Sequence, residues 1–107
     1  MDQRRTRRFK LQLPLEITRS GVARVALAGR TKDISSSGVL FTADREPDPG
    51  RSIEYIITLN HDGTQAVNLR CVGKIVRMER MPAASGGAST GVEVAATLER
   101  YEFVREQ

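Results

Sequence analysis

The 107-residue sequence has no tryptophan and only five aromatic residues, so its core must be built mainly from aliphatic side chains. It has a single cysteine, Cys71, which excludes a disulfide within the chain, and a single histidine, His61. One thiol and one imidazole fall short of the ligand set of a structural zinc site. No pairing of a nucleophile with a base is visible either. We therefore expect a protein that is not an enzyme and that has no metal or cofactor.

The sequence also lacks a long hydrophobic run. The longest apolar stretches, such as residues 55–57, are far too short to span a bilayer, and the N-terminus lacks the apolar region of a signal peptide. Hydrophobic residues make up 39% and charged residues 28% of the chain, which is typical of globular proteins, and the length fits one domain. We expect a soluble, cytoplasmic protein without membrane insertion.

What the sequence does have is an alternation of apolar and polar residues along most of its length, the period of half-buried β-strands. In residues 10–18, for example, four apolar side chains share one face: Leu11, Leu13, Leu15 and Ile17. The pattern predicts further strands at 22–27, across 30–43 with a polar interruption, and at 51–60, 66–78 and 90–96. Cys71, Phe41 and Tyr55 fall in apolar registers, so we expect all three to be packed in the core, with an inert thiol.

Turn-forming residues separate these strands. Turns are predicted at 20–21, 28–29 and 61–63, and irregular segments at 44–50 and 81–89. Pro14 cannot donate to a sheet, which places it at an edge or beside a bulge. Several short strands with turns between them indicate an antiparallel barrel or sandwich. The tail from Thr97 has a helix-forming composition, and we expect a short helix there with Leu98, Tyr101 and Val104 able to face the sheet.

Two stretches are not explained by folding alone. The first is the N-terminal cluster of Arg4, Arg5, Arg7 and Arg8, part of a net charge of +4. Guanidinium groups this close repel one another and cannot lose their protons, which suggests an anionic partner. Taken alone, the cluster is equally typical of a solvated basic arm that binds nucleic acid weakly.

The second stretch is "DISSSG" at residues 33–38, with Asp33, Ser35 and Gly38 in a D-x-S-x-x-G pattern. By itself this pattern is typical of a tight turn or bulge, because Asp and Ser side chains bond local backbone groups and glycine relaxes the backbone. Ser36 and Ser37 are expected to be exposed loop residues.

Together, the R-x-x-x-R spacing of Arg4 and Arg8 and the following D-x-S-x-x-G stretch resemble the paired signature of the PilZ domain, the bacterial receptor module for cyclic di-GMP. The likeness covers essentially the whole chain, through "KDISSSGVLF", "PGRSIEYIITL", "LRCVGKIVRM" and "TGVEV". The resemblance implies a six-stranded antiparallel β-barrel of split-barrel type with a C-terminal helix. It also implies a flexible arginine-rich loop at residues 1–9 and a barrel domain at 10–107, with the helix from about 97.

The resemblance further implies a ligand-binding site for cyclic di-GMP, formed by Arg4, Arg5, Arg8, Asp33, Ser35 and Gly38. The planar fork of an arginine suits phosphodiester oxygens and the O6 and N7 edge of guanine. A carboxylate accepts from guanine N1–H and its exocyclic amine, a donor pair that adenine lacks. Ligand binding would order the arginine loop, and a downstream protein would read that change.

Three questions stay open at this point. A small basic barrel that binds single-stranded nucleic acid is an alternative, although such proteins usually supply more aromatic platforms for stacking bases. A PilZ-like domain used only for protein contacts is another. The roles of Arg5 and Arg7 and the number of ligand molecules per chain, one or two, are also undecided.

Overall fold

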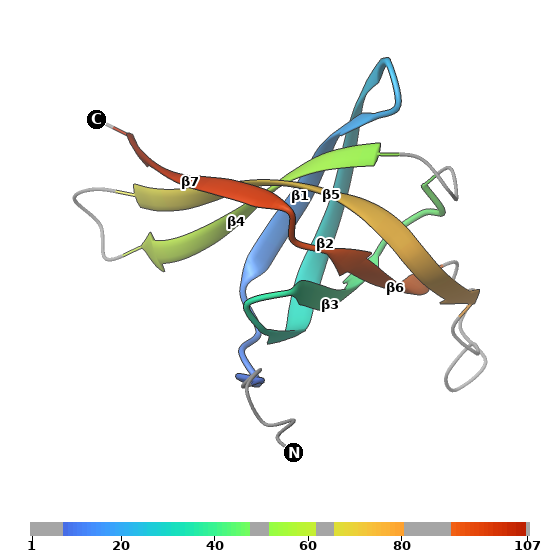
Figure 1. The fold of residues 1–107 in the computed structure, drawn as a ribbon, viewed down its shortest axis with the longest axis horizontal. Coiled ribbons are helices and arrows are strands. Elements are labelled where there is room, and N and C mark those ends of the chain that lie inside the picture. The colour runs from blue at the N-terminus through green and yellow to red at the C-terminus, as the bar shows by residue number, and fades with distance from the viewer. Residues whose placement is uncertain (1–7, 48–51, 62–65, 81–90, 107) are drawn as a thin grey trace.

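The computed structural model describes residues 8–47, 52–61, 66–80 and 91–106. These residues form seven antiparallel strands (Figure 1). The strands are β1 (Pro14–Ser20), β2 (Ala23–Ile34), β3 (Gly38–Ala43), β4 (Ser52–His61), β5 (Ala66–Arg80), β6 (Val92–Thr97) and β7 (Arg100–Glu106). Their order is β4-β1-β2-β3-β6-β5-β7, and β4 also pairs with β5. The first six strands therefore close into the expected six-stranded antiparallel barrel, and β7 is an additional strand.

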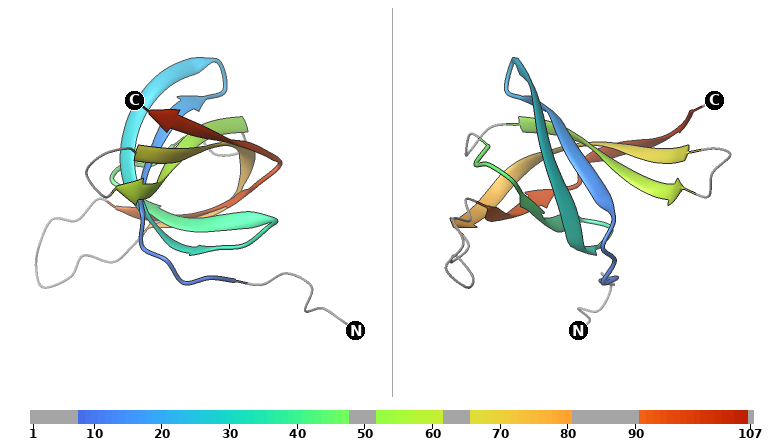
Figure 2. Two further views of the ribbon diagram at one scale, coloured as in Figure 1. Left: turned by 90° about the vertical axis from the view of Figure 1, so that its left-hand side faces the viewer. Right: turned by 180° about the vertical axis from the view of Figure 1, so that it is seen from behind.

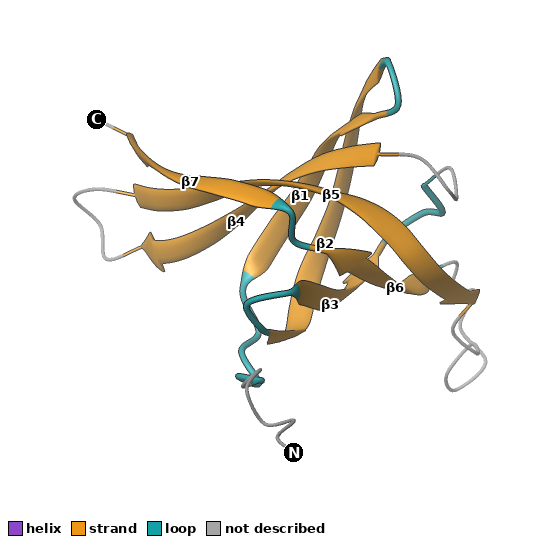
Figure 3. Cartoon of the chain, viewed as in Figure 1, coloured by secondary structure: helices purple, strands orange, loops and turns teal. Residues whose placement is uncertain are grey.

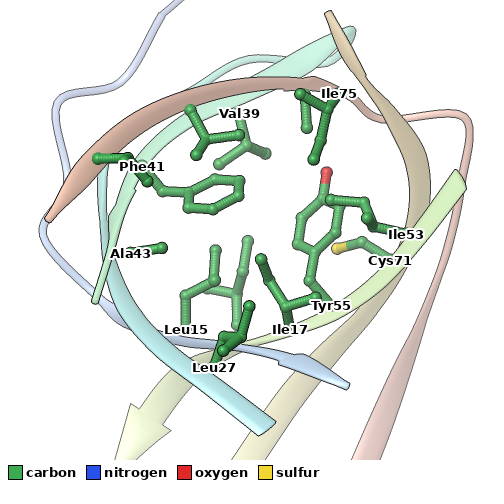
Figure 4. Close-up of a cluster of buried hydrophobic side chains, with 14 of the residues drawn as sticks. Leu15, Ile17, Leu27, Val39, Phe41, Ala43, Ile53, Tyr55, Cys71 and Ile75 are labelled. Atoms are coloured by element: carbon green, nitrogen blue, oxygen red, sulfur yellow. The ribbon is translucent and has the colours of Figure 1, made fainter. Parts of the chain in front are cut away.

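The core fills the inside of this barrel, and it follows from the period-two pattern of the sequence. In β4, for example, Ile53, Tyr55 and Ile57 are at most 1% exposed, whereas the residues between them are partly exposed. Figure 4 shows side chains from several strands converging on the barrel interior. Phe41 and Tyr55, with ring centroids 5.9 Å apart, are its largest members, and Cys71 lies beside them fully buried. The predicted core positions of all three are confirmed.

One feature of the first hairpin differs from the sequence-based predictions and one agrees with them. The turn predicted at residues 28–29 is wrong, because β2 continues through Ala28 and Gly29 to Ile34. Gly29 is held in the sheet from both sides, by pairing with Leu15 of β1 and Ala43 of β3. Pro14 pairs with Arg30 of β2, whereas the pairing of β1 with β4 begins only at Leu15, so β1 lies at an edge at Pro14, as predicted.

The predicted C-terminal helix is also wrong. The described residues contain strands and loops only (Figure 3), and residues 100–106 form β7 alongside residues 66–72 of β5. Tyr, Phe and Val favour extended structure. The pairing of β6 with β5 begins only at Ile75, so the preceding part of the same edge of β5 offers backbone N–H and C=O groups with which β7 can pair. No helix long and apolar enough to cross a membrane occurs among the described residues.

The strands β6 and β7 run successively along the same edge of β5, interrupted at Leu98 and Glu99. Gly73 of β5 makes this junction possible. A Cβ atom there would lie only 1.8 Å from the carbonyl oxygen of Thr97, so the two backbones approach more closely than any side chain permits. Thr97 is held by the Tyr55 hydroxyl, which donates to its carbonyl at 3.0 Å, while its own hydroxyl accepts from the Lys74 N–H at 2.8 Å. Beyond the junction, β4, β5 and β7 project from the barrel together (Figure 2).

Candidate ligand-binding site

The chain before β1 is fixed to the end of β2 by backbone pairing. Phe9 and Ile34 exchange two hydrogen bonds of 2.8 and 2.9 Å. Further along, the Thr31 N–H donates to the carbonyl of Leu13, and the buried Thr31 hydroxyl accepts from the Leu13 N–H and donates to the carbonyl of Leu11. Because this contact is antiparallel, Arg8 comes opposite Ser35, and Asp33 lies diagonally across the bridge from Arg8.

Arg8 and Asp33 accordingly form an ion pair. The distance from Arg8 Nη1 to Asp33 Oδ2 is 3.9 Å, too long for a hydrogen bond. The Arg8 side chain is 69% exposed, whereas that of Asp33 is only 16% exposed. A pair at this distance, with one partner largely exposed, contributes little to stability, at most about 1 kcal/mol. The contact between Arg8 and Asp33 itself uses none of the hydrogen-bonding capacity of either group.

Ser35 organises the turn between β2 and β3. Its hydroxyl accepts from the N–H groups of Ser37 and Gly38 at 3.3 and 3.2 Å, and it lies 3.2 Å from the Gly38 carbonyl. The Ser35 N–H also donates to that carbonyl, at 2.8 Å. The turn is tied to the β6–β7 junction by the Leu98 N–H, which donates to the carbonyl of Ser37 at 2.9 Å. Ser35 thus has a structural function in addition to any contact with a ligand.

Gly38 begins β3 at the point where this strand meets β6. A Cβ atom on Gly38 would lie 2.9 Å from the carbonyl oxygen of Ala96, slightly closer than real Cβ contacts. Of the glycines in the described residues, only Gly21, in the β1–β2 turn, has a positive φ. Glycine is therefore favoured at position 38 because the backbone of Ala96 lies so close to it, and not because Gly38 has an unusual backbone conformation.

Arg8, Asp33, Ser35 and Gly38 line one surface hollow of about 230 Å³. Other parts of its wall come from β3, β5 and β6 and from the turn before β3: Ser37, Val39, Leu40, Val76, Arg77, Ala95, Ala96 and Thr97. Ligand pockets commonly span roughly 300–1,000 Å³, so this hollow would hold one part of a nucleotide-sized ligand and leave the rest on the surface. Two guanidinium groups against one carboxylate give its charged groups a positive balance.

The contribution of Arg77 could not be read from the motifs. β5 has an irregularity between Ile75 and Arg77, which pair with the neighbouring Ala96 and Ala95 of β6. Strict alternation would place Arg77 on the same face as the buried Ile75, but the irregularity leaves Arg77 exposed beside Val76, and both line the hollow. The sequence signal is Arg77 itself, a charged residue where the alternation predicts an interior position. Arg4, Arg5 and Arg7 lie outside the described residues.

A second hollow, of about 290 Å³, lies over β4, β5 and β7 and is lined by Glu54, Arg70, Val72, Arg100, Tyr101 and Glu102. Its charges are balanced, because Arg70 Nη1 lies 3.2 Å from Glu102 Oε2 and the wall holds two arginines and two glutamates. It therefore offers no preference for an anion.

The Cys71 thiol is not suited to act as a nucleophile. Burial raises the pKa of Cys71 from 9.0 to about 12, so the thiol stays protonated at neutral pH. No group of three potential metal-ligating side chains occurs in the part of the chain that the structure describes.

The described residues thus form a closed antiparallel barrel with a hollow at its surface that is lined by two arginines and one carboxylate. The family model for the PilZ domain matches residues 2–103, nearly the whole sequence, and the chain therefore belongs to the PilZ domain family. Searches among curated proteins and among solved structures gave no match. PilZ domains are in general receptor modules for cyclic di-GMP and not enzymes.

Proposed function

We propose that this chain is a cyclic di-GMP receptor that binds its ligand at the hollow around Arg8 and Asp33. The observation that carries the proposal is the convergence of Arg8 with Asp33, Ser35 and Gly38 on one wall, from segments about 25 residues apart in sequence. The backbone pairing of Phe9 with Ile34 maintains this arrangement without a ligand.

Arg8 and Asp33 supply complementary chemistry to a guanine nucleotide. The exposed guanidinium of Arg8 can donate two parallel hydrogen bonds to a phosphodiester or to the O6 and N7 atoms of guanine. The carboxylate of Asp33 accepts from guanine N1–H and the exocyclic amine, which adenine cannot reproduce. A site built to hydrogen-bond a donor pair strongly rejects an analogue that lacks it, because the carboxylate is then left unpaired.

The turn at residues 35–38 gives the site its shape. The Ser35 hydroxyl keeps the turn compact, and the absence of a side chain on Gly38 allows β3 to lie close to β6. Gly38 therefore adds no side chain to the hollow, which leaves room for a planar base beside the turn. Arg77 of β5 supplies a second cation to the hollow.

Arg4 and Arg5 complete the proposed site, reaching the outer phosphate or the second base from the segment before Arg8. In this proposal, ligand binding orders that segment, and the altered surface is read by a downstream protein. Hydrogen exchange of the full chain tests this part: amides in residues 1–9 should be protected by cyclic di-GMP, and unchanged exchange there would exclude the ordering step.

Calorimetric titration of the full chain with cyclic di-GMP and with cyclic di-AMP tests the binding function. We expect saturable binding of the guanine dinucleotide only. Loss of one or two charge-assisted bonds of about 1.5–3 kcal/mol each should make Arg8→Ala bind at least roughly tenfold more weakly. Arg8→Lys should also bind more weakly, because it keeps the charge but loses the fork.

Arg19→Ala is the matched control. Arg19 is also exposed and pairs with one carboxylate, Glu54, at 3.2 Å, but it does not line the hollow. Its removal should leave the affinity unchanged. If wild-type protein does not bind cyclic di-GMP, or if Arg8→Ala binds as well as wild type, the proposed site is wrong. A matching titration with a short single-stranded oligonucleotide at two salt concentrations separates the remaining alternative, since only nucleic-acid binding would show a steep salt dependence.

A further inference from the structure

Among the described residues, the strand β7 is paired along one edge only. Its seven residues pair with β5, and no other strand among the described residues pairs with it. In Figure 1 it forms the outer margin of the extension made with β4 and β5, and the C-terminus lies at its tip. An unpaired edge presents a row of backbone N–H and C=O groups, which is a template for another strand.

This edge also exposes two of the few aromatic residues of the chain. Tyr101 and Phe103 lie opposite Cys71 and Leu69, so their side chains are on the face of the sheet that becomes the barrel interior. They are 59% and 67% exposed, and their rings pack edge to face with centroids 6.3 Å apart. Contiguous exposed aromatic surface beside an unpaired edge is typical of an interaction site.

The sequence of β7 is complementary to itself when two copies run antiparallel. A two-fold axis through Phe103 aligns all seven residues of both strands and places the two Phe103 residues opposite each other. In this register Tyr101 lies opposite Arg105, which suits cation–π contact, and Glu102 lies opposite Val104.

The neighbouring registers are less favourable. A shift by one residue places the apolar faces of the two copies on opposite sides of the joint sheet. A two-fold axis through Glu102 sets that carboxylate directly against its copy, and an axis through Val104 aligns only residues 102–106 of each strand. Like charges directly opposite one another are destabilising. The register centred on Phe103 therefore combines the largest overlap with no like-charge pair.

We propose that the chain forms a symmetric dimer by antiparallel pairing of β7 with β7 of a second copy, centred on Phe103. The joint sheet continues from β5 of one subunit to β5 of the other. The hollow around Arg8 and Asp33 takes no part in this pairing, so dimer formation and nucleotide binding can be tested separately.

Sedimentation equilibrium of the full chain tests the assembly. We expect wild-type protein to reach twice the monomer mass of 11.8 kDa with increasing concentration. Phe103→Lys places a charge at the centre of the interface and should weaken the dimer at least tenfold, with an unchanged circular dichroism spectrum. Val22→Lys is the control, because Val22 is 93% exposed in the β1–β2 turn and outside β7. A monomer at all concentrations in wild type, or an unaffected dimer in Phe103→Lys, overturns the proposal.

Cysteine crosslinking tests the register. Directly opposed residues of antiparallel strands have Cα atoms roughly 4.5–5.5 Å apart, within the range that a disulfide can bridge. Under mild oxidation Phe103→Cys should therefore form a covalent dimer rapidly, whereas Val22→Cys should not. The native Cys71 is buried and does not compete. Equal crosslinking rates in the two variants exclude the register centred on Phe103.

Discussion

Replacing Gly73 by alanine should strongly destabilise the barrel at the junction of β6 and β7. The new Cβ atom would lie 1.8 Å from the Thr97 carbonyl oxygen and 2.7 Å from its carbonyl carbon, whereas real Cβ contacts are essentially never below 3.0 Å. Both groups belong to backbone held in a sheet, so neither can move aside by changing a side-chain torsion. The strands must separate by more than an ångström.

The free-energy cost follows from the contacts that this separation breaks. The Tyr55 hydroxyl would lose its acceptor on Thr97, and the Lys74 N–H would lose the Thr97 hydroxyl. A lost hydrogen bond costs about 1 kcal/mol, and a buried hydroxyl left without a partner costs about 1–3 kcal/mol, which together give about 3 kcal/mol. For a domain of about 100 residues this corresponds to a decrease in Tm of roughly 12–24 °C.

Thermal unfolding of the full chain followed by circular dichroism measures the effect. Lys74→Ala is a suitable control, because the Lys74 side chain is exposed and the variant keeps the backbone N–H that binds Thr97. Its Tm should stay within about 3 °C of wild type, as is usual for surface positions. A Gly73→Ala variant as stable as Lys74→Ala would refute the conclusion that the close backbone approach requires glycine.

Three further predictions concern the site and the core. Asp33→Asn should weaken cyclic di-GMP binding by roughly tenfold or more in calorimetry while changing stability by less than about 1 kcal/mol, since its contact with Arg8 is 3.9 Å long and the Arg8 side chain is exposed; a large loss of stability with unchanged affinity would contradict this. Gly38→Ala should lower stability by about 1 kcal/mol through contact with the Ala96 carbonyl, so a variant of unchanged Tm that still fails to bind would show that the ligand, and not the backbone, requires glycine. Burial raises the pKa values of Cys71 and Tyr55, so both ionise more readily in the unfolded chain, and stability in urea should fall as pH rises above 9. Cys71 should contribute up to about 1.4 kcal/mol per pH unit between pH 9 and pH 12, so Cys71→Ala should show a smaller slope there.

The barrel itself could be predicted from the sequence because its strands bury one face only. The alternation in β4 is sufficient to mark Ile53, Tyr55 and Ile57 as core residues, and all three are buried. The continuation of β2 through Gly29 was harder to predict. Gly29 has the local chemistry of a turn residue, but its pairing with two neighbouring strands decides its conformation, and that pairing involves residues distant in sequence.

The C-terminal strand shows the same limit more clearly. Its glutamates and arginines favour a helix, whereas its aromatic residues and Val104 favour a strand, so local composition does not choose between them. The choice is made by the open edge of β5 at residues 66–72, more than 25 positions earlier. A prediction from local pattern has no access to that edge.

For the candidate site, the two motifs predicted which residues would lie together. Their proximity depends on the antiparallel contact of Phe9 with Ile34, which a sequence does not display. The resemblance to the PilZ domain implied only that the two motifs form one site. Arg77 was not predicted, because its position in the hollow depends on the irregular pairing of β5 with β6. Arg4 and Arg5 remain predictions, since they lie outside the described residues.

The 15-residue strand β5 has a consequence for how many molecules the protein can hold at once. It contributes Val76 and Arg77 to the hollow near one end and Leu69, opposite Phe103, near the other. Eight residues of extended chain separate Leu69 from Arg77, a span of roughly 25 Å. A dinucleotide at one end and a second subunit at the other would therefore not compete for space, and a single strand would connect the two occupied surfaces.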